Sequence, residues 1–161
     1  MNEYNVGIHQ NGEYIMEYHI RAMEERDVPY VSQIENEIFS LPWSGKSFID
    51  AACNPDNIYL VCECTGEIAG YCGMWTVMGE GNVTNVAVHP SYRRKGIANA
   101  LLKEMEKRAK EKSVTIFFLE VRQSNEAAKK LYEKLGYSPI GTRKRFYEKP
   151  VEDAVVMSKT L

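Results

Sequence analysis

The chain has 161 residues, of which 44% are hydrophobic and 26% are charged, and its formal net charge is −2 at pH 7. This length suits one domain with a core of its own, and so small a charge argues against a strongly basic nucleic-acid-binding or membrane-surface protein. No apolar run approaches the roughly 18 residues that a membrane span needs, and residues 1–5 lack the features of a signal peptide. We therefore expect a cytoplasmic protein whose partners include neither a membrane nor, directly, nucleic acid.

The chain divides into a short arm and one domain. Residues 1–13 are rich in asparagine and glycine, which is typical of a variable N-terminal arm, and residues 14–161 contain no linker or repeat. Hydrophobic periodicity and turn residues predict, in chain order, a strand over Tyr14–Arg21, a helix capped by Asp27 and reaching Ile38, a short helix over Lys46–Ala52, strands over Ile58–Cys64, Glu67–Met78 and Val83–Val88, a helix over Arg94–Glu111, a strand over Thr115–Val121, a helix over Asn125–Leu135, and strands over Tyr137–Tyr147 and Ala154–Thr160. This order predicts a mixed α/β (α+β) fold with a mostly antiparallel sheet.

The four cysteines are Cys53, Cys62, Cys64 and Cys72. Zinc sites usually combine a ligand pair, separated by about two to four residues, with a second pair further on, and this sequence lacks the second pair. A catalytic thiol would need a base nearby, and no motif links a histidine to one of these thiols. We expect buried, reduced thiols and no metal site.

The clearest functional signal is the junction from Val86 to Ala98. An apolar segment meets a proline turn, then three cations and Gly96, then a helix whose apolar residues recur every four positions. Free backbone N–H groups and the positive end of a helix dipole meet at such a junction, and glycine lets the backbone approach a ligand closely. Cations at a helix N-terminus oppose its dipole unless an anion is present. The junction predicts a phosphate or pyrophosphate site, and a basic surface helix is the alternative.

The same junction resembles the acetyl-CoA motif Arg/Gln-x-x-Gly-x-Gly/Ala of the GNAT N-acetyltransferases, and Ala98 stands where a second glycine is commoner. The order of the expected elements matches that fold over about residues 15–161. Residues downstream of the junction also stand at the family spacing, namely Asn125, Ala128, Leu131-Tyr132 and Leu135-Gly136-Tyr137.

Further segments resemble one branch of that family, the bacterial ribosomal-protein-alanine N-acetyltransferases (RimI), which acetylate the N-terminal alanine of small-subunit ribosomal protein eighteen. These segments are Glu35, Phe39 and Pro42–Ser44, the run Leu119–Arg122, and Glu152–Ala154 with Met157. The resemblance implies a sheet with splayed central strands and helices on both faces. It also implies acetyl-CoA as co-substrate, no metal, and the N-terminal peptide of the ribosomal protein as acceptor.

The resemblance places acetyl-CoA against the junction. The pyrophosphate is expected on the basic loop and the helix N-terminus. The backbone of the preceding strand is expected to pair with the pantetheine amides and to polarise the thioester carbonyl, which is an oxyanion-hole role. The residues implied are Val86, Ala87, Val88, Arg93, Arg94, Lys95, Gly96, Ile97, Ala98, Asn99 and Asn125.

Acetyl transfer to an amine needs a base for the ammonium proton, and Glu120 is the candidate. It stands on a predicted strand among Phe118, Leu119 and Val121, so we expect a buried carboxylate, which is a stronger base than an exposed one. The resembling branch uses this glutamate as general base, acting directly or through a water. A structural carboxylate held by Arg122 is the alternative.

The leaving thiolate needs a proton donor, and Tyr132 is the candidate. It lies seven residues, two helical turns, after Asn125, so both are expected on one helix face, with Leu131 and Leu135 directed to the core. Asn125 would then bond to the pantetheine or phosphate region of the cofactor. A tyrosine that only packs against the sheet is the alternative.

The acceptor peptide is expected near Glu35, Trp43 and Tyr147, although Trp43 also suits a core anchor. The sequence does not fix the oligomeric state, and a monomer is the simplest expectation. Two other functions stay open: a GNAT enzyme for a small-molecule amine or for broader protein N-termini, and a non-catalytic acyl-CoA-binding module. Because such a module would usually lack Glu120 and Tyr132, we favour an enzyme.

Overall fold

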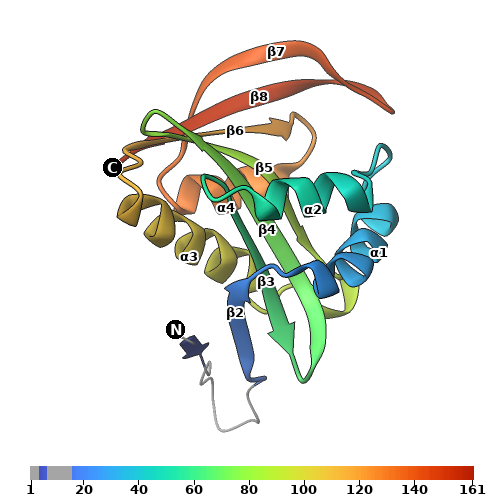
Figure 1. The fold of residues 1–161 in the computed structure, drawn as a ribbon. Coiled ribbons are helices and arrows are strands. Elements are labelled where there is room, and N and C mark those ends of the chain that lie inside the picture. Colours follow the sequence, from blue (N-terminus) through green and yellow to red (C-terminus); the bar gives the residue numbers. More distant parts are fainter. Residues whose placement is uncertain (1–3, 7–15) are drawn as a thin grey trace, which may run out of the picture.

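The computed structural model describes residues 4–6 and 16–161, which form one eight-stranded sheet in the order β1-β2-β3-β4-β5-β6-β8-β7 (Figure 1). Neighbouring strands are antiparallel except for β5 and β6, which are parallel, so the predicted mixed α/β fold with a mostly antiparallel sheet is confirmed. The strands are β1 (Tyr4–Val6), β2 (Tyr18–Ala22), β3 (Ile58–Cys64), β4 (Glu67–Val77), β5 (Glu80–Val88), β6 (Ile116–Arg122), β7 (Ser138–Glu148) and β8 (Val151–Thr160).

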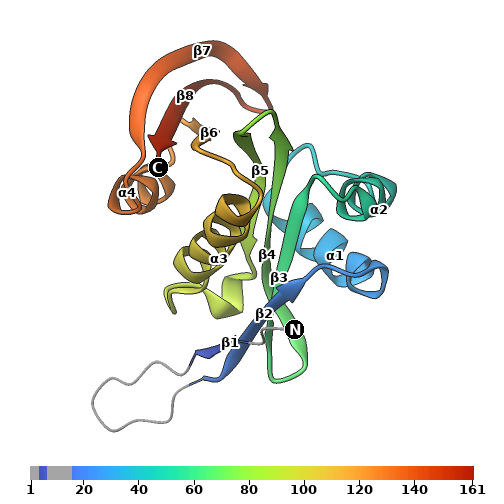
Figure 2. The ribbon, with the colours of Figure 1, turned by 60° about the vertical axis from the view of Figure 1, so that its left-hand side comes forward.

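Helices cover both faces of the sheet. Helices α1 (Val28–Ile38) and α2 (Gly45–Cys53) lie on one face, and α3 (Ile97–Glu111) and α4 (Glu126–Lys134) lie on the other (Figure 2). Each pair buries its own hydrophobic cluster against the sheet: Phe48 and Tyr71 belong to the α1–α2 side, and Leu101 and Leu119 to the α3–α4 side. Among the described residues no helix is both long and apolar enough to cross a membrane.

Two tight hairpins set the register of β3, β4 and β5. Thr65–Gly66 and Met78–Gly79 each have two successive positive φ angles, which is the geometry of a two-residue type I′ turn. The second turn corrects two predicted strand ends. β4 ends at Val77 and not at Met78, and β5 begins at Glu80 and not at Val83.

The central strands separate after a short paired stretch. β5 and β6 pair only from Glu80–Asn82 to Ile116–Phe118. Directly after this stretch β5 has an irregularity against β4, where Thr84 is an extra residue between the paired positions Val83 and Asn85. A bulge of this kind bends a strand and ends its pairing. The predicted splaying of the central strands is therefore confirmed, and β6 continues in the sheet through β8 alone.

Two further elements begin three residues away from their predicted starts, and one strand was not predicted. Helix α3 begins at Ile97 and not at Arg94, because Arg94 (φ 61°) and Gly96 (φ 78°) have left-handed backbone angles. Strand β8 begins at Val151, three residues before the predicted Ala154. Within the expected arm, Tyr4–Val6 form an edge strand paired with β2. The predicted start of β2 at Tyr14, and residues 1–3 and 7–13, lie outside the described residues.

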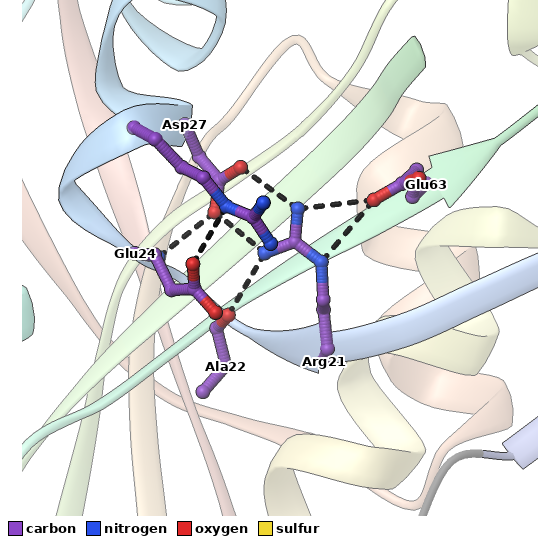
Figure 3. Close-up of polar contacts among 6 residues, drawn as sticks. Arg21, Ala22, Glu24, Asp27 and Glu63 are labelled. Atoms are coloured by element: carbon purple, nitrogen blue, oxygen red, sulfur yellow. Dashed lines mark hydrogen bonds and ion pairs between the residues drawn. The ribbon is translucent and has the colours of Figure 1, made fainter. Parts of the chain in front are cut away.

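An ion-pair network joins β2, β3 and the segment before α1 (Figure 3). Arg21 pairs with Asp27 at 2.6 Å and with Glu63 at 3.0 Å, and the carboxylate of Asp27 accepts the backbone N–H of Glu24. Burial disfavours the ionised form of Asp27, but the bonds from Arg21 and Glu24 outweigh it, so the pKa of Asp27 lies below its usual value. Asp27 is the N-cap residue of α1, as predicted, but its side chain makes no cap bond to that helix.

Three of the four cysteines are buried as expected, and the fourth is not. Cys62, Cys64 and Cys72 are buried free thiols, and burial raises the pKa of each. Cys53, at the end of α2, is exposed. The buried thiols are therefore small apolar core residues, which makes them poor nucleophiles at neutral pH.

Candidate active site

The two candidate catalytic residues lie on opposite faces of the sheet, beside the gap between β5 and β6. Side chains alternate along β6, and Leu119 and Val121 pack into the α3–α4 cluster. Glu120 therefore projects to the α1–α2 face. Tyr132, on α4, is 8% exposed and belongs to the α3–α4 cluster. A group that extended through the gap would meet the tyrosine on one face and the glutamate on the other.

Glu120 is only half-buried, so the prediction of a buried carboxylate is wrong. Its side chain is 28% exposed, and Oε1 lies 3.5 Å from Nε of Arg143, whose own side chain is 60% exposed. The sheet register explains this pair. Glu120 aligns with Val156 of β8, and Val156 aligns with Gly141 of β7. Gly141 has no side chain, which leaves room for the side chain of Arg143, two residues further on. Arg122, expected as the alternative partner, ion-pairs with Glu152 instead.

Tyr132 is enclosed more fully than its helix pattern predicted. Burial raises the pKa of Tyr132. The negative charges that Tyr147 and Cys72 would carry if ionised raise it further, by a smaller amount. The phenol of Tyr132 is therefore protonated at neutral pH. Its ring packs edge-on against Tyr137 at 5.8 Å between centroids. The predicted face assignment is wrong in part, because Tyr132 is itself a core residue together with Leu135, whereas Leu131 is only half-buried.

Asn125 does not share the environment of Tyr132. It is the N-cap of α4, with backbone angles outside the helical range, and its Oδ1 accepts the N–H of Ala128 at 3.1 Å. Its side chain is exposed, whereas Tyr132 is buried. The capping bond occupies one lone pair of Oδ1 and leaves the amide N–H₂ group available to a ligand.

The predicted anion loop lies at the N-terminus of α3. Gly96 is the N-cap residue, and the first N–H groups of a helix have no partner within the helix. Ile97 is buried beneath this turn, Ala98 and Asn99 are half-buried, and Arg94 is exposed. Together these groups form a positively charged helix end that suits a phosphate.

Two of the three cations of that loop have partners within the chain. Nε of Arg93 donates to the carbonyl of Val88 at 3.2 Å, which connects the loop to the end of β5. Nζ of Lys95 lies 5.5 Å from the centre of the Tyr92 ring. Both side chains are exposed, so they can turn toward an anion at small cost.

The end of β5 brings Val86, Ala87 and Val88 to the edge of the gap. Val86 and Val88 pack toward the α3–α4 cluster, and Ala87 packs toward the α1–α2 cluster. All three pair with β4 on one side, and none pairs with β6 on the other. In an antiparallel strand alternate backbone groups point away from the partner, so some groups of this segment point into the gap.

Glu35 is a buried anchor and not a surface residue. It is 2% exposed, and its carboxylate accepts hydrogen bonds from the hydroxyl of Tyr71 and, at 3.0 Å, from the N–H of Trp43. Burial raises its pKa, and the bonds from Tyr71, Trp43 and Asn85 oppose that rise. Glu35 therefore holds the α1–α2 side of the molecule from within the core, and a contact with the acceptor stays a prediction. Its partners Tyr71 and Asn85 carried no signal in the sequence, because their meeting depends on the sheet register.

Trp43 and Tyr147 border the face that carries Glu120. Trp43 is half-buried against the rings of Phe48, Tyr59 and Trp75, at 5.4–6.3 Å between centroids, so it anchors the loop of residues 39–44, the α1–α2 loop. Tyr147, at the end of β7, is half-buried, and the guanidinium of Arg122 lies 4.2 Å from its ring centre. Sequence reasoning named Arg122 only as a partner for Glu120, and it missed both the stacking of Arg122 on Tyr147 and the ion pair of Glu120 with Arg143.

The chain is similar to known acetyltransferases over most of its length. The model of the acetyltransferase (GNAT) family matches residues 28–137. A Bacillus subtilis (strain 168) protein, named as a candidate ribosomal protein bS18-alanine N-acetyltransferase, is 40% identical over 143 residues, which cover 88% of this chain and 95% of that protein. The ribosomal protein bS18-alanine N-acetyltransferase of Escherichia coli (strain K12) is 35% identical, with 86% and 95% covered. The crystal structure of the ribosomal-protein-S18-alanine N-acetyltransferase from Escherichia coli superposes with a TM-score of 0.82, at 31% identity, over 89% of this chain and 93% of that one.

Proposed function

The chain belongs to the GNAT acetyltransferase family, and we propose that it transfers the acetyl group of acetyl-CoA to the N-terminal alanine of a small-subunit ribosomal protein, protein eighteen. Relatives with that name share 35–40% identity with this chain over 143 residues. The observation that carries the proposal is the placement of Glu120 and Tyr132 on opposite faces of the sheet, on either side of the gap between β5 and β6.

The loop before α3 fits the charged end of acetyl-CoA. Left-handed backbone angles at Arg94 and Gly96 turn the loop so that it leads into the N-terminus of α3, where the helix dipole favours a negative charge. The residues that would hold the pyrophosphate are the backbone groups of Gly96–Asn99 and the cations Arg94 and Lys95. Arg93 would act mainly by holding the loop to β5 through Val88.

The reacting end of the co-substrate would lie in the gap. Acetyl-CoA supplies the thioester, and the chain supplies backbone N–H groups at Val86 and Val88 that can bond to the pantetheine amides and to the thioester carbonyl. These groups already lie at the edge of the gap, so little reorganisation would be needed as negative charge develops on the carbonyl oxygen.

Glu120 would accept the proton that the attacking amine must lose. A free α-amine has a pKa near 8, so much of it is protonated at neutral pH and cannot attack. The exposed side of Glu120 faces the acceptor side of the gap, where its carboxylate can take the proton directly or through one water. The neighbouring Arg143 is exposed and can leave when the ammonium group arrives, because a solvent-exposed ion pair is weak.

Tyr132 would donate a proton to the thiolate of CoA as it leaves. Because its pKa is raised, the phenol keeps its proton at neutral pH until a strong base forms next to it. The departing thiolate is such a base, and a buried site gives its charge no other stabilisation. Tyr147 and Trp43 would border the acceptor on the other face.

The test is a transfer assay with peptides of matched sequence. The enzyme is incubated with acetyl-CoA and the N-terminal hexapeptide of ribosomal protein eighteen, and the acetyl group is located by mass spectrometry. We expect one acetyl group on the α-amine of alanine. An otherwise identical peptide with a blocked α-amine and one lysine is the control. Acetylation of lysine or of small amines in preference to the alanine peptide would favour the broader GNAT alternative, and binding of acetyl-CoA without any transfer would favour the non-catalytic module.

A further inference from the structure

The carbonyl oxygen of Lys149 joins three segments that are far apart in the chain. Ser40, in the α1–α2 loop, donates its hydroxyl to this oxygen at 2.5 Å. Arg122, at the end of β6, donates Nη2 to the same oxygen at 3.1 Å. Lys149 and Pro150 form the turn between β7 and β8, so this β7–β8 turn is bound both to the α1–α2 loop and to β6.

Arg122 holds the turn with several donors of one planar group. Its Nη1 donates to the carbonyl of Pro150 at 3.1 Å and lies 3.4 Å from Oε1 of Glu152, while the guanidinium stacks over the ring of Tyr147. The other carboxylate oxygen of Glu152 accepts the N–H of Ser124 at 2.6 Å. A lysine cannot reproduce this arrangement, because its ammonium group has neither the plane nor the fork of a guanidinium.

The α1–α2 loop is fixed on its other side by Glu35. The buried carboxylate of Glu35 accepts the N–H of Trp43, three residues after Ser40. The loop is therefore bound to helix α1, through Glu35, at Trp43 and to the β7–β8 turn at Ser40. These two bonds fix the distance between the loop and the turn, although both segments lie at the surface.

These contacts lie beside the proposed base. Glu120 and Arg122 are two residues apart on β6 and project from the same face. Burial raises the pKa of Tyr147, the positive charge of Arg122 opposes that rise, and the negative charge of Glu120 adds to it, so the ring held by Arg122 is also a neighbour of Glu120. The α1–α2 loop and the β7–β8 turn therefore border the side of the gap from which an amine reaches Glu120.

We propose that Arg122 and Ser40 are positioning residues that fix the width of the acceptor site: through the Lys149 carbonyl they hold the β7–β8 turn and Tyr147 at a set distance from the α1–α2 loop. The proposal rests on the proposed acetyl transfer to an N-terminal alanine. A fixed, narrow entrance selects a small first side chain, and a loosened one admits a larger one. Neither residue needs to touch the reacting atoms for this effect.

The test compares the wild-type enzyme with four single variants at Ser40 and Arg122, with the double variant Ser40→Ala/Arg122→Gln and with one control. Ser40→Ala and Arg122→Gln remove the contacts to Lys149, and Ser40→Thr and Arg122→Lys keep the hydroxyl or the charge. Arg108→Gln is the matched control, because it removes another guanidinium bound to a carboxylate, 2.8 Å from Glu104, on α3. For each protein kcat and KM are measured with acetyl-CoA and with hexapeptides that begin with alanine or leucine, and active enzyme is counted by titration with CoA.

We expect Ser40→Ala to raise the KM for the alanine peptide by about threefold, which is typical for the loss of one hydrogen bond, and Arg122→Gln to raise it by about tenfold. The preference for alanine over leucine should fall in both, while the KM for acetyl-CoA stays within about twofold. Ser40→Thr should restore wild-type values, and Arg122→Lys should lie between Arg122→Gln and the wild type. The double variant should lose less than the product of the single effects, since both residues bind one carbonyl.

Two results would overturn the proposal. One is an unchanged peptide KM and alanine preference in both Ser40→Ala and Arg122→Gln. The other is a loss of activity that is proportional to the loss of active enzyme and is equally large in Arg108→Gln. That result would make the contacts purely structural. A wild-type enzyme that acetylates no peptide would instead refute the proposed function, so the two failures are distinguishable.

Discussion

Replacing Glu120 with glutamine separates the proposed base from a structural carboxylate. Glutamine keeps the shape of the side chain and removes its basicity, so kcat should fall by about 10²–10⁴, the usual range for the loss of a general base. The structure predicts a small effect on stability. The side chain of Glu120 is 28% exposed, and its partner Arg143 is 60% exposed, so the lost ion pair is worth at most about 1 kcal/mol.

The same variant should bind acetyl-CoA normally, because Glu120 projects from the face of the sheet opposite α3 and Tyr132. The assay measures kcat from the release of free CoA, affinity for CoA by calorimetry, and the melting temperature. The deficit in kcat should shrink above about pH 8, where the α-amine loses its proton without help. Normal activity at pH 7 would make Glu120 structural. A deficit that stayed constant up to pH 9.5 would contradict a role in proton removal.

Three further variants test other parts of the molecule. Gly96→Asp should abolish binding of acetyl-CoA in calorimetry, because it puts a β-carbon at φ 78° and a negative charge where a pyrophosphate is expected; wild-type affinity would refute the site. Tyr132→Phe should keep its melting temperature within a few degrees and lose at least about tenfold in kcat, with a smaller deficit for a thioester of a more acidic thiol; equal deficits with both thioesters would exclude acid catalysis. Asp27→Asn should cost about 1–3 kcal/mol at pH 7 in denaturant unfolding. Because the folded-state pKa of Asp27 is lowered, its stabilising effect is present above its ordinary value of 3.8 and is lost as the pH falls below it. The gap between wild type and Asp27→Asn should therefore close on acidification, and a gap that stayed constant to pH 2 would refute this origin.

Local patterns were sufficient to predict most of the elements. The spacing of apolar residues gave α1 and β3 with the observed ends, and the junction from Val86 to Ala98 was placed correctly between a strand and a helix. The errors at Met78–Gly79 and at Arg94 have one physical cause. In both places non-glycine residues adopt positive φ, which is uncommon and has no reliable signature in the sequence.

The surroundings of the candidate residues were harder to predict, because they depend on strand order. Glu120 stands between apolar residues in the sequence, but its neighbour Arg143 comes from a strand two positions away in the sheet. Glu35 was expected near the acceptor peptide, yet it meets Tyr71 and Asn85 of the central strands. Pairwise contacts of this kind follow from the register of the whole sheet, which periodicity along one segment does not contain.

The separation of Glu120 from Tyr132 has a chemical consequence for the proposed reaction. A carboxylate and a phenol within hydrogen-bond distance can bond to each other, and that bond competes with their bonds to a substrate. Here the two groups are on opposite faces of the sheet, so the amine and the thioester would have to meet in the gap before either group acts. The gap itself arises because β5 and β6 pair over three residues only and then diverge at the bulge beside Thr84.

Beyond that point the strand edges at the gap have backbone groups without a partner strand, and such groups must be satisfied by water or by a ligand. An extended chain with amides of its own, such as pantetheine, fits that requirement as a substitute strand. The irregularity that opens the sheet therefore also supplies the surface that would hold the co-substrate between the two catalytic groups.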